Sequence, residues 1–452
     1  MEIDRTSIRD LELFGIYYDG EFLFEKGVVS VFNLAQTKPG KKYIEDYFSN
    51  PFSSIDKIRT NQQSLNYFVN NFNLWKSLLD ELSYYEFDGV ERYLSSNILG
   101  FYSPNFFKMK YKSSIFRIFY EDIIEEIISG ILSVINLVEK AEKILDLLRK
   151  SEPDSRLFIE EVNIIEKFFK LEITKSLKNF QDLKHNTSKV LKIDYQLRNE
   201  HIDLVKKLLY TVAKFDGLLG LAKGFIEHGL TFPEFVSEKP YIDAIDFYHP
   251  LLKRPVKNSI VISKENNFLF ITGPNMGGKT TFLKALGLCV YLAHLGYGVP
   301  AKSFKLSVFD SLTTIINTYE NITKGYSTFM AEVKKVKEIA KKVVSKKSCL
   351  ILMDELFKGT NFEDACETTK AVILRMVKCK NSIFVLSTHL FEIAESIKDC
   401  KGILFKCFEA GENENEINYD YRLKDGVSRT KLGMKILKNE KILEIFDKER
   451  EQ

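Results

Sequence analysis

The sequence predicts an α + α/β protein, in which a mostly helical first part precedes an α/β domain with a largely parallel sheet. Between about residues 113 and 221, apolar residues recur at three- and four-residue spacing, which is typical of helices. After about residue 233, short continuous apolar runs alternate with helical patterns, which is typical of strands buried in a parallel sheet. The composition, with 45% hydrophobic and 28% charged residues, is that of a folded globular chain and excludes wholesale disorder.

The 452 residues divide into three successive parts by their sequence pattern. Residues 1–105 mix polar turns with short helical patterns, and we expect them to form the first part of a core domain. Residues 106–235 carry long charged helical patterns with a break at Pro153, and they predict the helical remainder of the core with its levers. A helix of about 30 residues is about 45 Å long, so this part is either a lever or an ordinary helical bundle. Residues 236–452 carry the α/β pattern.

Three continuous apolar runs and three helical patterns outline the α/β domain. The runs predict strands buried on both faces, at 268–272, 350–353 and 382–387. The helical patterns lie between or beside these strands, at 280–296, 328–345 and 362–379. This alternation predicts a parallel α/β sheet.

Charge, cysteine usage and hydropathy limit the classes of protein that fit. Lys plus Arg number 65 and Asp plus Glu 62, so the net charge of +3 excludes a polycation, and nucleic-acid contact would require a local patch. The six cysteines form no CxxC pair, which favours reduced thiols over a disulfide framework. No apolar run approaches about 20 residues and no signal peptide opens the chain, so we expect a soluble cytoplasmic protein without membrane contact.

The strongest chemical signal is a glycine-rich run that follows a predicted strand and opens a predicted helix. It matches GxxxxGK[ST] and consists of Gly273, Pro274, Asn275, Met276, Gly277, Gly278, Lys279 and Thr280. Its glycines let backbone N–H groups close around phosphate oxygens, and the helix directs its positive end at them. Lys279 would hold the β- and γ-phosphates, and the Thr280 hydroxyl would bind Mg²⁺. The run therefore predicts a nucleoside-triphosphate site.

Two carboxylates and a histidine follow the other buried strands. Asp354 ends the run 350–353 and fits a carboxylate that holds the Mg²⁺ shell, while Glu355 is placed to polarise an attacking water. Alone, the pair would be interpreted as solvated acids, but the phosphate loop upstream favours the catalytic interpretation. His389, in Ser-Thr-His after the next strand, either senses the γ-phosphate or orients water, or is structural.

These residues resemble the MutS family of DNA mismatch-repair proteins, in which the Pro-Asn-Met insertion of the loop is distinctive. The resemblance continues through Thr281 and through the segments 326–332, 352–355, 359–360, 387–392 and 425–433. Upstream, His249-Pro250 and Pro255-Val256-x-Asn258 match the family's approach to the nucleotide, and the segments 4–13 and 51–62 resemble the start of its core domain. The matching segments are spread over nearly the whole chain.

The resemblance implies a MutS core and lever followed by a P-loop ATPase domain of the ABC type, with dimerisation helices near the end of 236–452. It implies an Mg²⁺- and ATP-dependent, DNA-binding ATPase in DNA repair or recombination, acting through ATP-driven closure of a homodimer. The loop residues 273–281, Val256 and His249 would bind ATP. Glu355, Lys279 and His389 would be catalytic, and Thr280 and Asp354 would bind the metal.

The resemblance also implies composite sites, in which Ser327 and Thr328 of one subunit act on the γ-phosphate held by the other. A helix start suits this role because its free N–H groups and a hydroxyl can meet a phosphate. Within one chain the same residues would be an ordinary helix N-cap, and the two roles are compatible.

Departures from the family pattern bear on DNA and adenine. We expect no mismatch-reading or connector domain, because the chain begins at the core. Phe119-Tyr120-Glu121 echoes the family's Phe-x-Glu wedge, but its apolar helical setting predicts core packing. Pro255 stands where the family often has an aromatic residue that stacks on adenine, which leaves Val256 as an apolar contact.

Two alternatives remain open on sequence. The lysine-rich stretch 167–192 favours DNA if it lies at a lever tip, and is otherwise a solvated helix face. The alternative function is an ATP-gated scaffold or switch that binds a protein partner without DNA. A small-molecule kinase is disfavoured because no lid or acceptor-site motif accompanies the loop.

Overall fold

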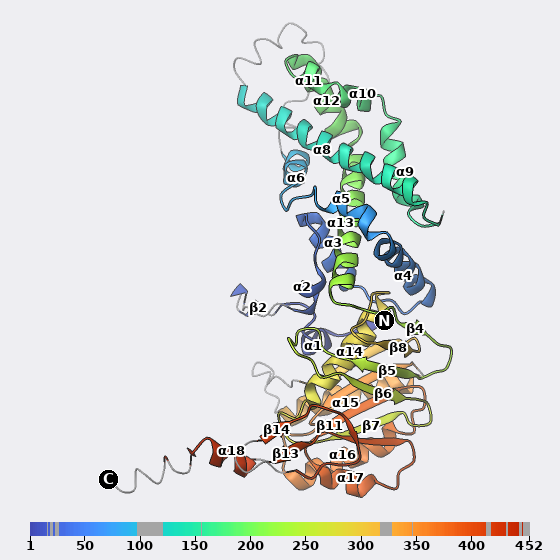
Figure 1. The fold of residues 1–452 in the computed structure, drawn as a ribbon, viewed down its shortest axis with the longest axis vertical. Coiled ribbons are helices and arrows are strands. Elements are labelled where there is room, and N and C mark those ends of the chain that lie inside the picture. The colour runs from blue at the N-terminus through green and yellow to red at the C-terminus, as the bar shows by residue number, and fades with distance from the viewer. Residues whose placement is uncertain are drawn as a thin grey trace. The chain divides into compact units, whose positions relative to one another are not determined.

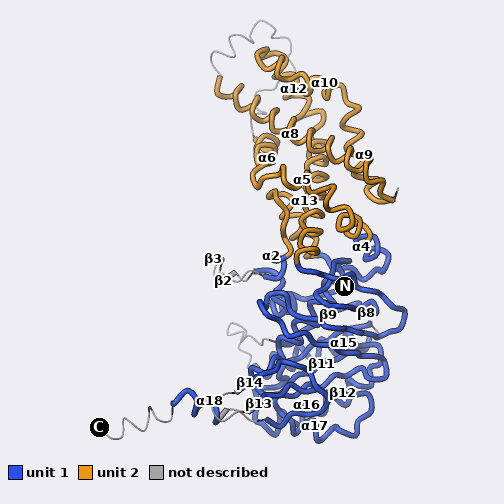
Figure 2. Tube along the Cα trace, viewed as in Figure 1, with its two compact units in different colours: residues 1–31, 50–62, 228–452 blue, residues 32–49, 63–227 orange. Residues whose placement is uncertain are grey.

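The computed structural model describes residues 1–15, 17–18, 21–22, 27–96, 121–154, 156–316, 328–345, 347–412, 417–430, 433–442 and 445. The chain forms two compact units (Figure 2). Unit 1 comprises Met1–Val31, Asn50–Gln62 and His228–Gln452, and unit 2 comprises Phe32–Ser49 and Gln63–Glu227. The first 31 residues thus share a compact unit with the second half of the chain. The division into three successive domains remains a prediction.

Within its described residues, unit 2 contains helices and their connections and no strand (Figure 1). Its elements are α3 (Lys38–Phe48), α5 (Phe72–Leu79), α6 (Asp88–Ser95), α8 (Glu121–Ser151), α9 (Ile159–Phe169), α10 (Ile173–Lys178), α11 (Phe180–Leu183), α12 (Thr187–Tyr195), the π-helical turn η3 (Gln196–Glu200) and α13 (Ile202–Glu227). Helix α4 (Ile55–Asn70) begins in unit 1 and ends in unit 2. The 31-residue α8 ends two residues before Pro153, as the break in the sequence pattern predicts.

The core of unit 2 forms around α13, which packs against α3, α5, α8 and α9. Its apolar face is buried because aromatic rings from three elements meet on it. Trp75 stacks on Phe215 with ring centroids 5.5 Å apart, and Phe68 and Phe158 contact the same ring of Phe215 at 5.8 and 5.3 Å. Aromatic pairs of this kind add to the burial energy of the rings themselves.

Unit 1 contains the predicted sheet, which is parallel except at one edge (Figure 1). Its order is β1 (Glu2–Ile3), β9 (Ser311–Ile315), β10 (Cys349–Asp354), β11 (Ile383–Thr388), β7 (Phe268–Thr272), β12 (Ile403–Cys407) and the antiparallel β15 (Lys424–Asp425). A second sheet has the order β4 (Glu234–Phe235), β8 (Ser303–Leu306), β5 (Ile242–Phe247) and β6 (Asn258–Ile262). Two short hairpins pair β2 (Tyr17–Tyr18) with β3 (Glu21–Phe22) and β13 (Ala410–Glu412) with β14 (Ile417–Tyr419).

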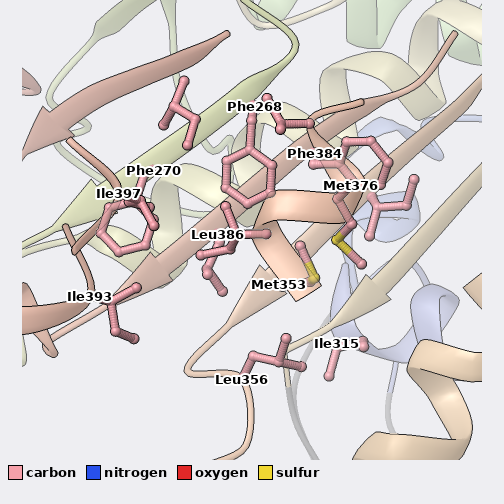
Figure 3. Close-up of a cluster of buried hydrophobic side chains, with 14 of the residues drawn as sticks. Phe268, Phe270, Ile315, Met353, Leu356, Met376, Phe384, Leu386, Ile393 and Ile397 are labelled. Atoms are coloured by element: carbon pink, nitrogen blue, oxygen red, sulfur yellow. The ribbon is translucent and has the colours of Figure 1, made fainter. Parts of the chain in front are cut away.

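Besides α4, the helices that lie wholly or partly in unit 1 are α1 (Arg5–Asp10), α2 (Val28–Phe32), α14 (Lys279–His294), α15 (Thr328–Val344), α16 (Phe362–Met376), α17 (Phe391–Ile397) and α18 (Gly433–Asn439). Both faces of the main sheet are covered by helices of this set. Helix α14 packs against β10 and β11 of the main sheet and against β5 of the second sheet. On the other face, α15, α16 and α17 enclose an apolar cluster that includes Phe268, Phe384, Met376 and Ile393 (Figure 3). The predicted strands and helices of this part are confirmed.

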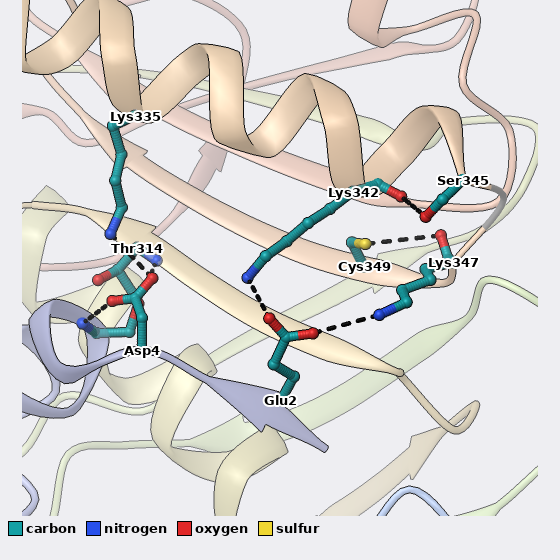
Figure 4. Close-up of polar contacts among 9 residues, drawn as sticks. Glu2, Asp4, Thr314, Lys335, Lys342, Ser345, Lys347 and Cys349 are labelled. Atoms are coloured by element: carbon teal, nitrogen blue, oxygen red, sulfur yellow. Dashed lines mark hydrogen bonds and ion pairs between the residues drawn. The ribbon is translucent and has the colours of Figure 1, made fainter.

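The N-terminal segment anchors itself to the main sheet of unit 1. β1 pairs with β9, and the buried Asp10 carboxylate accepts hydrogen bonds from the Thr314 hydroxyl at 2.6 Å and the Ile316 amide at 3.1 Å. Glu2 and Asp4 add ion pairs to α15 and to the residues after it (Figure 4). Because partly exposed pairs contribute little, the buried Asp10 contacts and the strand pairing hold the segment in place.

The structure bears on the expectations about the cysteines and about membrane-spanning helices. The six cysteines are all free thiols, as their spacing predicts. No helix in the described part of the chain combines the length and the hydrophobicity that crossing a membrane requires.

Candidate functional site

The glycine-rich run lies between β7 and α14, where backbone geometry dictates two of its glycines. Gly273 has a φ of 153°, and a Cβ there would lie 2.7 Å from the carbonyl oxygen of Phe408. Gly278, at the start of α14, has a φ of 101°, which is rarely open to residues with a side chain. The loop therefore needs glycine to turn sharply from the strand into the helix. The amino end of α14 is thereby directed at the loop.

Lys279 is almost fully buried at the mouth of this loop, with 5% of its surface exposed. Its Nζ donates to the carbonyl oxygens of Gly273 at 2.8 Å and Pro274 at 3.0 Å. Burial lowers the pKa of the ammonium group, while the nearby carboxylates of Glu355 and Asp354 act in the opposite direction. The loop thus carries a buried donor group that a bound anion would stabilise in its charged form.

Thr280 and Asp354 meet next to the loop. The Thr280 hydroxyl donates to Asp354 Oδ2 at 2.6 Å, so the two predicted metal ligands are brought together. Both are hard oxygen donors, the type that Mg²⁺ prefers. Within the described residues, no group of three or more His, Cys, Asp or Glu could hold a metal ion. The Thr280 hydroxyl and the Asp354 carboxylate fit Mg²⁺, which typically takes one or two protein oxygens and completes its shell with water and phosphate.

Glu355 and His389 form a second contact at the end of the same strands. Glu355 directly follows β10 with a φ of 50°, and its backbone N–H donates to the Ser387 carbonyl oxygen at 2.9 Å. Its Oε1 lies 3.0 Å from His389 Nδ1. This hydrogen bond lowers the pKa of Glu355 although burial opposes the shift, and the positive charge of Lys279 adds to the lowering. The carboxylate is therefore ionised at neutral pH and can accept a proton from water.

A cavity of about 600 Å³ opens beside the loop. Its wall includes the predicted ATP contacts His249 and Val256 and the loop residues from Pro274 to Thr281. The size is within the range of small-molecule sites. Besides these residues the wall contains Phe247, Tyr248, Leu252, Arg254, Asn258, Phe282, Ala285, Asp354, Glu355 and Tyr421. All the predicted site residues of unit 1 whose side chains are described line this cavity, except Gly273 and His389, which contact the lining residues Lys279 and Glu355.

His249 brings a buried polar atom to the cavity wall. Its side chain is 5% exposed, and no described residue is within hydrogen-bond distance of its Nε2. Burial lowers the pKa of His249 to about 4, so the imidazole is neutral at pH 7. An unsatisfied buried nitrogen is costly, and a polar group of a ligand would satisfy it.

Tyr421 is a cavity residue that the sequence analysis missed. Asn258 holds its segment in place, because Nδ2 donates to the Tyr421 carbonyl oxygen at 3.1 Å and Oδ1 accepts from the Leu423 amide at 2.8 Å. The Tyr421 ring stacks on Tyr419 with centroids 5.9 Å apart. No local pattern marks Tyr421, which reaches the cavity only through the tertiary fold. Asn258 belongs to a segment that the sequence pattern places near the nucleotide, but the pattern assigns it no role.

Some of the predicted residues are not among those that the structure describes. Ser327 is not among the described residues, and Thr328 begins α15 without a described side chain, so their action on a second subunit stays a prediction. Phe119 and Tyr120 also lie outside the described residues, and Glu121 begins α8. The lysines of 167–192 lie on or between helices α9 to α12 of unit 2.

The parallel sheet, the glycine-rich turn from β7 into α14 and the carboxylates at the end of β10 define the class, a P-loop protein. The family model of MutS domain V matches residues 269–448. The chain is 35% identical over 248 residues to the DNA mismatch repair protein MSH3 of Candida glabrata, covering 52% of this chain and 24% of that protein. It is 29% identical over 281 residues to the DNA mismatch repair protein MutS of Carboxydothermus hydrogenoformans, covering 59% and 33%.

The DNA mismatch repair protein MutS of Petrotoga mobilis is 26% identical over 242 residues, which cover 53% of this chain and 29% of that protein. The match to MutS domain V over residues 269–448 and the similarity to these relatives support a place for the chain in the MutS family. The chain spans about a quarter to a third of the length of these relatives.

Proposed function

We propose that this protein is an Mg²⁺-dependent ATPase whose nucleotide site controls the binding of DNA. The observation that carries the proposal is the convergence of four groups at one cavity. The buried Lys279, the Thr280–Asp354 pair and Glu355 all reach the loop at the amino end of α14. This is the set of groups that phosphoryl transfer to water requires: a phosphate cradle, a metal site and a water-orienting carboxylate.

Binding would begin with the phosphates. Backbone N–H groups of the loop and the Lys279 ammonium would hold the β- and γ-phosphates. Thr280 and Asp354 would bind Mg²⁺, which would neutralise part of the phosphate charge. Tyr421 and Val256 offer apolar surface to the nucleobase across the cavity, and His249 offers a polar atom. Tyr421 would thus take the stacking role that Pro255 cannot fill.

Hydrolysis would rest on Glu355. Its lowered pKa keeps the carboxylate ionised, and one oxygen stays available for a water while the other contacts His389. His389 would hold Glu355 in place and contact the γ-phosphate. The reaction would transfer the γ-phosphoryl group to that water.

Two copies of the chain would share the work. We infer a homodimer in which Ser327 and Thr328 complete the site of the other subunit; Thr328 is the first residue of α15. The 17-residue α15 is held near its middle by the ion pair between Lys335 and Asp4, at 2.9 Å. The first N–H groups of a helix have no partner within the helix itself, which suits them to a phosphate held by another chain.

DNA would bind through lysines of unit 2. Helices α10, α11 and α12 lie together at one end of this unit (Figure 1). The exposed lysines on or next to helices α9 to α12 are Lys167, Lys170, Lys175, Lys178, Lys189 and Lys192. Such a local patch suits contact with phosphates of DNA despite the small net charge.

The nucleotide part is tested with the full-length protein and its Lys279→Ala variant. We expect Mg²⁺-dependent release of phosphate from ATP by the wild type and neither hydrolysis nor ATP binding by the variant. Arg254→Ala is the control, because Arg254 lines the cavity but is exposed and outside the loop. Equal hydrolysis by Lys279→Ala would reject the site.

The DNA part is tested by salt titration of binding to homoduplex, mismatched and branched DNA. Replacing Lys175, Lys189 and Lys192 with Gln should reduce the slope of log affinity against log salt by about one per lysine. The matched control replaces Lys206 and Lys207, which are exposed on α13. A slope equal to that of the wild type would exclude these lysines from the DNA contact. Wild-type protein that binds none of the three DNAs would favour the alternative, an ATP-gated switch that acts on a protein partner.

A further inference from the structure

Ser387 contacts both carboxylate positions of the site, although the sequence assigns it no role. It is fully buried near the end of β11, in register with Asp354 on β10. Its hydroxyl donates to Asp354 Oδ1, and its carbonyl oxygen accepts from the Glu355 amide at 2.9 Å. One residue therefore holds the metal carboxylate through its side chain and the water-orienting residue through its backbone.

The two oxygens of Asp354 have different partners. Oδ2 accepts from the Thr280 hydroxyl at 2.6 Å, and Oδ1 accepts from the Ser387 hydroxyl. Among the described residues, these are the hydrogen-bond donors to this carboxylate. Two hydroxyls on opposite oxygens fix the rotation of the carboxylate plane, which a single hydrogen bond would leave free. A hydroxyl can also donate to a carboxylate and bind a cation through a lone pair at the same time.

We propose that Ser387 is a positioning residue for the metal site, because its hydroxyl sets the plane of the Asp354 carboxylate toward Mg²⁺. The inference rests on the proposed ATPase function. Residues that orient a metal-holding carboxylate typically change metal affinity or activity by about 10- to 100-fold when they are removed. Ser387→Ala would remove the hydroxyl that contacts Asp354 but keep the backbone contact with Glu355. The Mg²⁺ concentration needed for activity should therefore change more than the rate of hydrolysis at saturating Mg²⁺.

The opposite end of β11 supplies a matched control. Ser382, immediately before β11, is also fully buried, and its hydroxyl also contacts the neighbouring strand β10. Its Oγ accepts from the Cys349 amide at 3.2 Å and donates to the Lys347 carbonyl oxygen at 3.3 Å. Ser382→Ala thus removes a comparable buried hydroxyl at the end of the strand far from the phosphate loop.

The first measurement is the Mg²⁺ dependence of ATP hydrolysis at saturating ATP. We expect Ser387→Ala to raise the half-maximal Mg²⁺ concentration about tenfold, with a nearly unchanged KM for ATP at high Mg²⁺. Ser387→Thr, which keeps the hydroxyl, should restore the wild-type value. Ser387→Cys, which is close in size and a weak donor, should fall between the two.

The second measurement does not depend on turnover. Binding of Mn²⁺ in the presence of a non-hydrolysable ATP analogue is followed by electron paramagnetic resonance, and the affinity should fall about tenfold in Ser387→Ala and not in Ser382→Ala. Wild-type Mn²⁺ affinity and Mg²⁺ dependence in folded Ser387→Ala or Ser387→Cys would overturn the inference. An equal shift in Ser382→Ala would assign the effect to strand packing and overturn it too. A wild-type protein that neither hydrolyses ATP nor takes up Mn²⁺ with the analogue would instead reject the proposed function.

Discussion

Unit 1 and unit 2 each bury a basic side chain beside carboxylates, and the two clusters differ in how their groups are satisfied. In unit 2, Arg198 pairs with Asp194 through two hydrogen bonds of 2.8 and 2.9 Å, and Tyr93 donates to the same carboxylate at 2.6 Å. In unit 1, the hydrogen bonds of the Lys279 ammonium to described residues go to two loop carbonyl oxygens. The guanidinium of Arg198 is paired with a fixed carboxylate, whereas the Lys279 ammonium, with three N–H donors, can also donate to a ligand.

This difference separates a structural use of buried charge from a chemical one. The bidentate arginine pair is buried and its charges are already matched, so it offers little to a substrate. The loop of unit 1 instead combines a partly desolvated ammonium with an unsatisfied His249 nitrogen and a carboxylate that is partly exposed. Groups with unused capacity at one cavity are expected at binding sites, because the ligand supplies the missing partners.

The largest expected effect concerns turnover in unit 1. Glu355→Gln should slow ATP hydrolysis on the order of 10²- to 10⁴-fold yet retain ATP, because the amide cannot accept a proton from water. Lys279→Ala should lose ATP as well. Phosphate release and equilibrium binding of labelled ATP measure the two effects separately. Equal loss of ATP binding in both variants would contradict the division of labour between them.

The next effect concerns stability in unit 2. Arg198→Ala should lower the free energy of unfolding by about 3–5 kcal/mol, because it leaves the Asp194 charge buried without its partner. Lys279→Ala should change stability much less, since its loop carbonyls can bind water instead. Urea unfolding followed by circular dichroism compares the two variants. A larger loss from Lys279→Ala would remove the distinction between the clusters.

A third prediction tests whether a second chain completes the nucleotide site of unit 1. Mixing Lys279→Ala with Ser327→Ala subunits should restore part of the ATPase activity, since one heterodimer site then has both halves intact. The other site carries both lesions. Each variant alone should be inactive, which is the control. Demonstrated heterodimers without activity would argue against sharing between subunits.

Sequence reasoning predicted the parts of this site that are local along the chain. Asp354 and Glu355 lie at the end of β10, and Lys279 and Thr280 begin the helix that follows β7. The parallel sheet brings the ends of these strands together at one edge. Tyr421 could not be predicted in the same way, because it reaches the cavity through a hydrogen bond to Asn258, far away in the sequence.

The N-terminal strand shows the same limit for the fold. Two residues of β1 are too few for a periodic pattern, yet they join the main sheet beside β9. What binds them is long-range: the carboxylate of Asp10 and the hydroxyl of Ser7 meet Thr314. The position of residues 1–31 in unit 1 rather than with the helices therefore follows from contacts that no local pattern encodes.

The smallest expected effect is a pH dependence that distinguishes the two units. Burial lowers the pKa of both His249 and His294 in unit 1 to about 4. Unfolding exposes them, and each then takes up a proton below about pH 6.5. The unfolded state therefore binds more protons between about pH 4 and 6.5, so unit 1 loses stability as the pH falls through that window. Each histidine contributes about 1.4 kcal/mol per pH unit.

The buried Asp216 of unit 2 works in the opposite direction. Burial raises its pKa although Thr37 and Gln36 donate to it, so the folded state binds the extra proton and acid favours folding. Hydrogen exchange of amides in α14 and α13, compared at pH 7 and 5.5, follows the units separately. His249→Asn should reduce the pH dependence of unit 1 by about one proton, while leaving that of α13 unchanged. If both units lost protection equally in acid, and the variant behaved like the wild type, the histidines would not be the cause of the pH dependence.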